Sequence, residues 1–174
     1  MSLYSESKAY LLAKLKEAGL KTKPYTTIKS LEKSQESHVG AVIFEQETIS
    51  RNGSKTLYKD QQGAQKKRRK VFNRNLTFTV TIGDYTDEAV EAMFETFLAS
   101  LDRGIFVNGD HVPIEVEGAD WVNKEDSILK AQVAVQVAIT FQGGLYRDTD
   151  FGPLTHVEIT TVQKNNGKEE PVNG

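Results

Sequence analysis

The chain has 174 residues, with 22 Lys and Arg against 24 Asp and Glu, so its formal net charge is −2. The length suits one domain, and the 38% hydrophobic content is that of an ordinary globular protein. The lack of cysteine excludes disulfide scaffolds, thiolate metal sites and cysteine nucleophiles. Because no stretch approaches the ~20 apolar residues of a membrane span and no signal peptide is visible, we expect no membrane partner.

The charges are unevenly distributed along the chain. Residues 1–50 carry seven bases and six acids, residues 51–74 carry nine bases and one acid, and residues 75–174 carry six bases and seventeen acids. The three segments therefore have net charges of +1, +8 and −11, which sum to −2. A short basic segment is set into an acidic chain, and any function has to account for it.

The N-terminal part begins with a predicted helix. Leu11, Leu15 and Ala18 follow helical spacing, and a glycine and a proline soon after them end the helix. Either Ser5 or Ser7 can cap its first turn. Residues 20–37 are polar and are expected to form an irregular connection with about one turn of helix.

The middle of the chain predicts two strands joined by a long connection. The first strand covers residues 38–50, and the connection that follows is rich in glycine and glutamine. The second strand is the clearest element, because apolar residues from Phe72 to Ile82 occupy one parity and Asn and Thr the other. We expect residues 51–65 to be a long hairpin connection or a mobile loop, and residues 51–70 as a whole to be poorly packed in the isolated protein.

The C-terminal half predicts a helix, a hairpin and a last strand. Thr86 caps the helix, which runs to Leu101 with a broad apolar stripe. Asn108-Gly109 between apolar runs is a strong hairpin signal. The last strand starts at Leu129 and is expected to end at Gly143-Gly144; its outer face is polar yet almost uncharged.

This order predicts an α+β fold, in which a mixed, mainly antiparallel sheet carries two α-helices on one face and a long flexible basic loop. We expect one domain over residues 1–148. Residues 149–174 are expected to be a largely flexible extension, within which residues 156–162 could form one peripheral strand.

Few residues suggest chemistry. The histidines His38, His111 and His156 are far apart in the sequence, so they form no helical metal pair. Asp110-His111 lies on the hairpin turn and is interpreted as a solvated turn. The sequence contains no phosphate-binding loop and no nucleophile motif.

Two pairs of acids are spaced i, i+2, namely Glu45 with Glu47 and Glu115 with Glu117. On a strand this spacing places both carboxylates on one face, and such a pair can bind a divalent metal ion in nucleases. The alternative, which we prefer, is the ordinary solvent face of a strand. We therefore expect no enzyme, no catalytic residue, no metal and no cofactor.

The run from Lys66 to Lys70 has three interpretations. It could bind nucleic-acid phosphates, form a solvated loop that guards a strand edge, or dock on an acidic surface of a neighbouring subunit. Nucleic acid ranks third, because only Tyr58 and Phe72 flank the run and the rest of the chain is acidic. The candidate assembly loop comprises Arg51, Lys55, Lys59, Lys66, Lys67, Arg68, Arg69 and Lys70.

The order of elements resembles the tail terminator proteins of long-tailed bacteriophages, also called tail completion or tail-tube terminator proteins. The resemblance rests on helix Ser7–Ala18, strands Ala41–Glu45 and Arg74–Val80, helix Thr86–Leu101 and strand Gln132–Phe141. It implies a phage or prophage protein of the virion tail, present in the bacterial cytoplasm during assembly. Such proteins form a homo-hexameric ring that caps the tail tube, ends its polymerisation and offers a surface to the head or neck.

The partners implied are copies of the chain itself, the tail-tube protein and head or neck connector proteins, and a lumenal position would allow non-specific contact with DNA. Ring proteins need exposed strand faces that bind neighbours yet stay soluble. The candidate faces comprise Asn73, Asn75, Thr77, Gln132, Gln136 and Thr140. A tail-tube subunit, a head–tail adaptor and a nucleic-acid-binding module remain alternatives.

Overall fold

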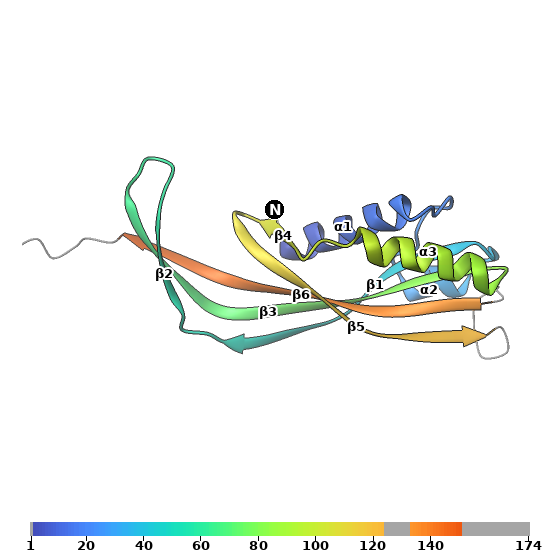
Figure 1. The fold of residues 1–174 in the computed structure, drawn as a ribbon. Coiled ribbons are helices and arrows are strands. Elements are labelled where there is room, and N and C mark those ends of the chain that lie inside the picture. Colours follow the sequence, from blue (N-terminus) through green and yellow to red (C-terminus); the bar gives the residue numbers. More distant parts are fainter. Residues whose placement is uncertain (1, 124–132, 151–174) are drawn as a thin grey trace, which may run out of the picture.

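The computed structural model describes residues 2–123 and 133–150 (Figure 1). The described chain forms a mainly antiparallel sheet with helices, which confirms the expected α+β class. The strand order is β1-β3-β6-β5-β4, and β2 pairs with β3 beyond the end of β1. The elements are α1 (Leu3–Glu17), α2 (Ile28–Glu32), β1 (Val39–Arg51), β2 (Lys55–Lys59), β3 (Gln65–Asp84), α3 (Asp87–Ser100), β4 (Gly104–Val107), β5 (Asp110–Asn123) and β6 (Val133–Asp150).

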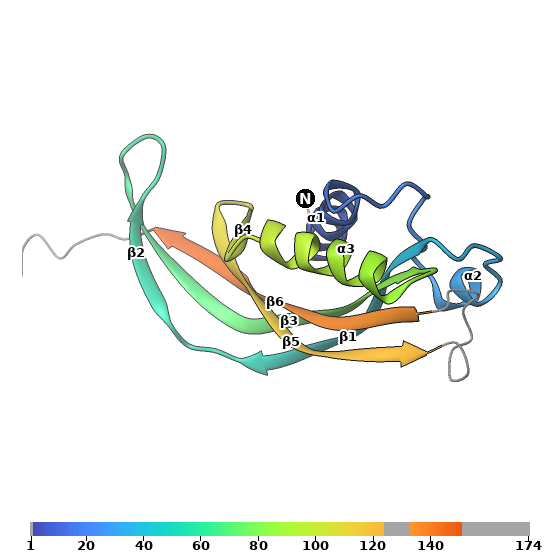
Figure 2. The same ribbon diagram turned by 45° about the vertical axis from the view of Figure 1, so that its right-hand side comes forward.

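Helices α1 and α3 cover one face of the sheet, as expected (Figures 1 and 2). The apolar parity of β3 faces them, and Phe78 packs there edge-to-face against Phe141 of β6, with ring centroids 6.0 Å apart. From α3, Val90, Met93 and Phe97 are buried against the same core. This helix-covered part of the sheet, here called the body, contains the main hydrophobic core.

Helix α1 begins earlier than the sequence pattern suggested. Ser2 is the N-cap, and its Oγ accepts a hydrogen bond from the amide of Ser5 at 3.2 Å. Leu3, at 8% exposure, extends the buried stripe of Leu11 and Leu15 by two turns, and the fully buried Ser7 occupies the position between them. That serine interrupts the apolar periodicity, which is why the sequence placed the cap at Ser5 or Ser7.

The opposite face of the sheet is covered only in part. Helix α2 places Leu31 against Val39, Ala41 and Ile43 of β1, and Tyr25 packs on this smaller cluster. The segment 20–37 therefore has a structural role: it shields the second face where β1 and β3 begin and end, respectively. The rest of that face carries the Asn and Thr parity of β3.

The strands β3 and β6 extend beyond the helices and, together with β2, form a projection that we call the arm (Figures 1 and 2). The arm consists of residues 55–59, 65–70 and 145–150. The expectation of a mobile loop over residues 51–65 is corrected here, because only residues 52–54 and 60–64 lie outside strands. All residues of the arm are described, and none is buried.

The end of β6 also differs from the prediction. Gly143-Gly144 does not end the strand, which pairs with β3 through Asp150. A Cβ on Gly144 would collide with the side chain of Lys70, and one on Gly143 with that of Leu3. The two glycines therefore make room for side chains that cross the strand, and they need not stop it.

Irregularities in three strands lie at one level of the sheet, which we call the seam. Strand β1 ends at Arg51 opposite Phe72, β3 has a register shift between Lys70 and Phe72, and the glycine pair of β6 lies opposite residues 73–74. Bulges and glycines let strands bend and twist. The arm bends away from the body at this seam (Figure 1).

The hairpin between β4 and β5 is confirmed. Asn108 and Gly109 both have positive φ, 52° and 84°, as a two-residue turn of this kind requires. Residues 124–132 and 151–174, with the expected start of the last strand and the peripheral strand over 156–162, lie outside the described residues. Of the expected flexible extension 149–174, Thr149 and Asp150 belong to β6 and the rest is not described. Within the described part of the chain, no helix is long and apolar enough to cross a membrane.

Candidate assembly surface

One face of the arm, which we call the inner face, is neutralised by acids of the chain itself. Its members point toward the turn between β4 and β5. Arg68 donates from Nε and Nη2 to the two carboxylate oxygens of Asp148, at 2.8 and 2.7 Å, and from Nη1 to Asp110 at 2.7 Å. Lys66 pairs with Asp150. The inner face comprises Tyr58, Lys66, Arg68, Lys70, Tyr146, Asp148 and Asp150.

Arg68 is the centre of this face. Its guanidinium also lies over the rings of Tyr58 and Tyr146, 4.8 and 5.7 Å from their centroids. The hydrogen bond to Asp148, and to a smaller extent the one to Asp110, raises the pKa of the Arg68 guanidinium. The same bond from Arg68 lowers the pKa of the Asp148 carboxyl. Bidentate Arg–carboxylate pairs are among the stronger polar contacts in proteins.

The contact between Arg68 and Asp110 joins the arm to the body. Asp110 is the first residue of β5, at the hairpin turn, so the bridge crosses from the arm to the β4–β5 hairpin. A cleft lies on each side of it, and both are lined by Arg68, Asp110 and Tyr146. Within the described residues this is the ion pair that ties the arm to the hairpin.

The other face of the arm, which we call the outer face, is built differently. Successive strand residues point to opposite sides, so the residues between those of the inner face share this one. Lys55, Arg69 and Arg147 lie directly opposite one another across β2, β3 and β6. In the next row Leu57, at 60% exposure, lies opposite Lys67. The outer face comprises Lys55, Leu57, Lys59, Gln65, Lys67, Arg69, Arg147 and Thr149.

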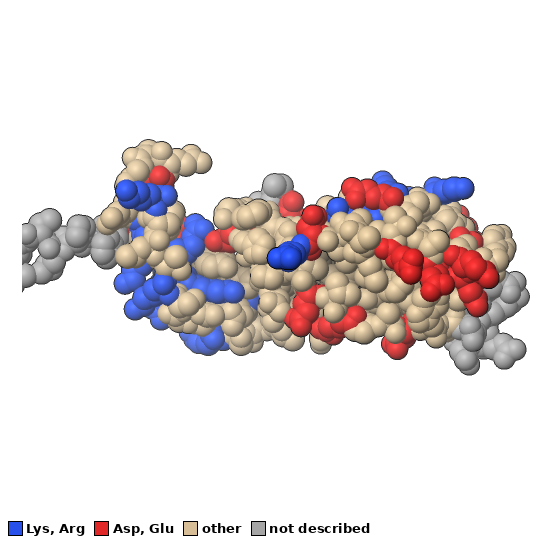
Figure 3. Space-filling model, in the orientation of Figure 1, with Lys and Arg blue, Asp and Glu red and all other residues tan. Residues whose placement is uncertain are grey.

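The outer face carries five bases and no acid. Within the described residues none of the five is part of an ion pair, in contrast to Lys66 and Arg68. The basic side chains gather at the arm in Figure 3, while acidic side chains gather toward the opposite end of the molecule, over α3. The charge asymmetry of the sequence is therefore also an asymmetry in space.

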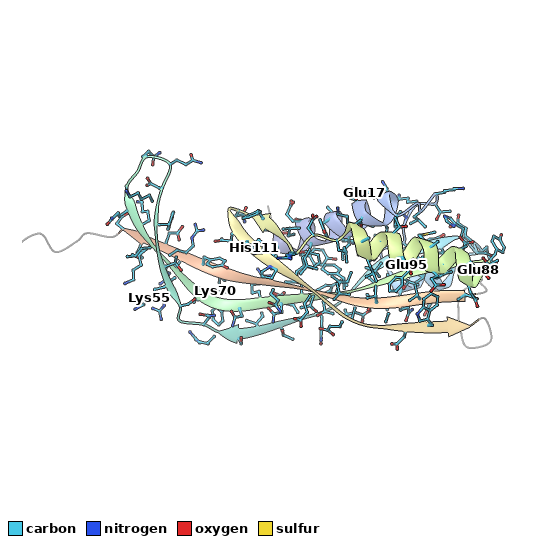
Figure 4. All side chains as sticks on the ribbon, viewed as in Figure 1. Glu17, Lys55, Lys70, Glu88, Glu95 and His111 are labelled. Atoms are coloured by element: carbon cyan, nitrogen blue, oxygen red, sulfur yellow. The ribbon has the colours of Figure 1, made fainter. Side chains whose placement is uncertain are left out.

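Helix α3 supplies much of that acidic surface. Its residues Asp87, Glu88, Glu91 and Glu95 are exposed, and the helix contains no Lys or Arg. Glu88, Glu91 and Glu95 are spaced i, i+3 and i+7, so they form one ridge. In Figure 4, Glu88 and Glu95 lie on α3 and Lys55 lies on the arm, toward opposite ends of the molecule.

The structure thus divides the eight predicted loop residues. Lys55, Lys59, Lys67 and Arg69 lie on the outer face. Lys66 and Arg68 are paired internally. The last two contact aromatic rings: Lys70 that of Tyr146 and Arg51 that of Phe72. Sequence reasoning missed Arg147, because it lies beyond the glycines that were expected to end the last strand.

The polar residues predicted as interface faces do share one face of the sheet. Asn73, Asn75 and Thr77 of β3 and Gln136 and Thr140 of β6 all point away from α1 and α3. Thr140 is only 6% exposed, however, and its hydroxyl lies 2.8 Å from that of Thr77. That pair is therefore an internal hydrogen bond, and Gln132 lies outside the described residues.

The histidines remain separate. His38 has a structural role: its Nε2 accepts from the Lys21 amide at 3.1 Å, so its Nδ1 donates to Asp84 at 2.7 Å. His111 contacts the exposed Phe106 ring, with centroids 5.2 Å apart. His156 lies outside the described residues. In the part of the chain that the structure describes, no group of three or more His, Asp or Glu could hold a metal ion.

The acid pairs are engaged by neighbours. Glu45 is the extra residue where the β1 register shifts, and Glu47 pairs with Arg74. On β5, Glu115 accepts from Gln142 at 2.6 Å, and Glu117 accepts from the Thr140 hydroxyl at 3.3 Å. Glu47, Glu115 and Glu117 are thus each oriented by a residue of an adjacent strand.

No protein-family model and no curated protein matches the chain. Among solved structures, the chain is similar to one titled "Cryo-EM Structure of an Extracellular Contractile Injection System, PVC sheath/tube terminator in extended state", with a TM-score of 0.48 and 13% sequence identity. The match covers 95% of this chain and 65% of that one, so the chain spans less than two thirds of its length. A likeness at this level does not establish a shared function.

Proposed function

We propose that the chain is a subunit of a tail terminator ring, which caps a tail tube, ends its polymerisation and provides the attachment surface for a head or neck. The role is structural and uses neither catalysis nor a cofactor. The partners are other copies of the chain, the tail-tube protein and connector proteins. The proposal rests on the resemblance in element order and on the form of the arm.

The arm is the observation that carries the proposal. A three-stranded projection without a buried residue contributes no core, and it bears an exposed leucine and a charged face without internal partners. An isolated domain gains little from such a feature, whereas a subunit of an assembly gains a surface that reaches a neighbour. The uncharged polar face of β3 and β6 offers a second contact surface of the soluble kind that a ring requires.

The test is to add the purified chain to polymerising tail-tube protein and to measure tube lengths by electron microscopy. We expect short tubes that carry one additional ring at an end. A chain that itself polymerised into long tubes would be a tube subunit. Tubes that grew to unchanged length, without an end ring, would contradict the terminator function.

Nucleic-acid binding is a second candidate, favoured by the unpaired bases of the outer face. Five bases in three successive rows could neutralise phosphates, and such binding weakens steeply with salt. DNA retention at low salt that is lost between 50 and 200 mM salt, as counterion release predicts for several phosphate contacts, would support it. Retention that the Lys55, Arg69 and Arg147 side chains do not influence would contradict it.

A further inference from the structure

The row of Lys55, Arg69 and Arg147 is unfavourable in an isolated subunit. The three bases lie directly opposite one another on adjacent strands, and like charges in such positions destabilise a sheet. On the inner face of the same strands, by contrast, Lys66 and Arg68 each have a carboxylate partner. The outer row has the properties of half of an interface.

The chain itself carries a complement to this row. On α3 the ridge of Glu88, Glu91 and Glu95 is exposed, and these acids form no ion pair within the described residues. Seven helical residues span about 10 Å. Three adjacent strands also span about 10 Å, measured from the first strand to the third. Three acids and three bases can therefore meet in register, one pair at each step.

We propose that the outer face of the arm docks on the α3 ridge of a second copy of the chain. The two surfaces lie toward opposite ends of the molecule (Figures 3 and 4), so the contact is head-to-tail. Head-to-tail contacts close into a ring when the rotation between subunits permits it. This inference rests on the proposed ring, and it identifies the two surfaces that join neighbouring subunits.

The character of the outer face favours a protein over a polyanion as the occupant. Leu57 is 60% exposed in the middle of the face, and a phosphate backbone offers no apolar contact for it. Helix α3 exposes the small side chains of Ala92 and Ala99 beside the ridge, which leave space for a leucine. The remainder of the chain is acidic and repels a polyanion while it attracts a basic arm.

The experiment exchanges charges between the two surfaces. One variant carries Lys55→Glu, Arg69→Glu and Arg147→Glu, and another carries Glu88→Lys, Glu91→Lys and Glu95→Lys. Self-association is measured by sedimentation over a wide range of protein concentration, at low and high salt. We expect the wild-type chain to associate more tightly at low salt, because exposed charge pairs are screened. Each variant alone should associate at least about tenfold more weakly.

Mixing the two variants is the decisive measurement. In the mixture the acidic arm of one variant meets the basic α3 of the other, and the reverse pairing also holds, so association should return. The matched control is Lys21→Glu, Lys23→Glu and Lys29→Glu, which reverses three exposed bases of the body and should leave association unchanged. Circular dichroism of each variant verifies that it is folded.

Three results would overturn the inference. They are a wild-type chain that does not associate at any concentration or salt, variants that associate like wild type, and a mixture that does not recover. Binding of a DNA oligonucleotide that the arm variant abolishes, with association intact, would assign the outer face to nucleic acid instead. The outcome is separable from capping, because tubes that remain uncapped while the charge exchange works would refute only the terminator function.

Discussion

The body and the arm contain the same long strands, yet different forces hold them together. In the body, Phe78, Phe141 and Phe97 are fully excluded from solvent, between the sheet and its helices. In the arm no side chain is buried, and the strands are held by their ladder, by ion pairs around Arg68 and by cations over tyrosine rings. The hydrophobic effect thus stabilises one region and polar contacts the other.

This difference has consequences for stability. Burial of apolar side chains is little affected by salt or acid, whereas exposed ion pairs contribute modestly and are screened. The arm should therefore open locally without global unfolding, at a free energy well below that of the body. Four perturbations separate the two regions, from the largest expected effect to the smallest.

The largest effect is expected in the body. Phe78→Ala removes a ring that contacts Tyr4, Phe44 and Phe141, and it should lower the free energy of unfolding by about 3–5 kcal/mol. Chemical denaturation measures the change. Leu57→Ala in the arm is the control and should change the value little, because Leu57 is mostly exposed. Equal losses in both variants would mean that the arm has a core of its own.

Arg68→Ala should act on the arm alone. It removes the guanidinium from Asp110 and Asp148, of which Asp148 keeps only the bond from the Tyr58 hydroxyl, and the loss of bonds to charged groups typically costs about 1–3 kcal/mol. Hydrogen exchange should therefore accelerate in the amides of β2 and of the arm parts of β3 and β6. Amides of the body should keep their protection. Arg69→Ala, one residue along on the outer face, is the matched control, and equal acceleration by both variants would contradict the role given to Arg68.

Acid should open the arm before it affects the body. The hydrogen bond from Arg68 lowers the pKa of Asp148 below its ordinary value of 3.8, and Lys66 lowers that of Asp150. A carboxyl with a depressed pKa stabilises the fold fully above 3.8 and loses that contribution as the pH falls through its lowered value. The ring resonances of Tyr58 and Tyr146 should shift in that range, while those of Phe78 and Phe141 stay in place. Simultaneous shifts in both sets would show one cooperative unit.

The smallest effect has the opposite sign. Arg69→Gln removes the central charge from the row with Lys55 and Arg147, which should stabilise the isolated chain by a few tenths of a kcal/mol. Precise thermal unfolding at low salt detects such a change, and 1 M salt should remove it. A loss of stability at low salt would show that the outer face is balanced by a neighbour within the same chain.

The body could be read from the sequence because its patterns are periodic. The alternation from Phe72 to Ile82 predicted both the strand and its face that packs against the helices. The apolar stripe of α3 predicted which side of that helix is buried. The serine at position 7 shows the limit of such patterns. A single polar residue in the α1 stripe was enough to move the predicted helix start.

The arm could not be read in this way. The run Lys66 to Lys70 has no apolar alternation, so nothing in it distinguishes a strand from a loop. Its stabilising partners Asp110 and Asp148 lie 42 and 80 residues away from Arg68 in the sequence, and only the fold brings them together. The row with Arg147 likewise depends on the register of three strands. It also depends on Gly143 and Gly144, a residue pair that usually indicates the end of a strand but here lies within one.

Because the strand irregularities all lie at the seam, the arm can act as one lever that bends there relative to the body. Force applied at its tip reaches the body by two routes, the ladders of β3 and β6 and the strut from Arg68 to Asp110. The strut ends on the β4–β5 hairpin, whereas the ladders continue into the strands that carry Phe78 and Phe141. We expect substitutions at the seam or the strut to change the angle between the arm and the body while the sequence of the core stays as it is.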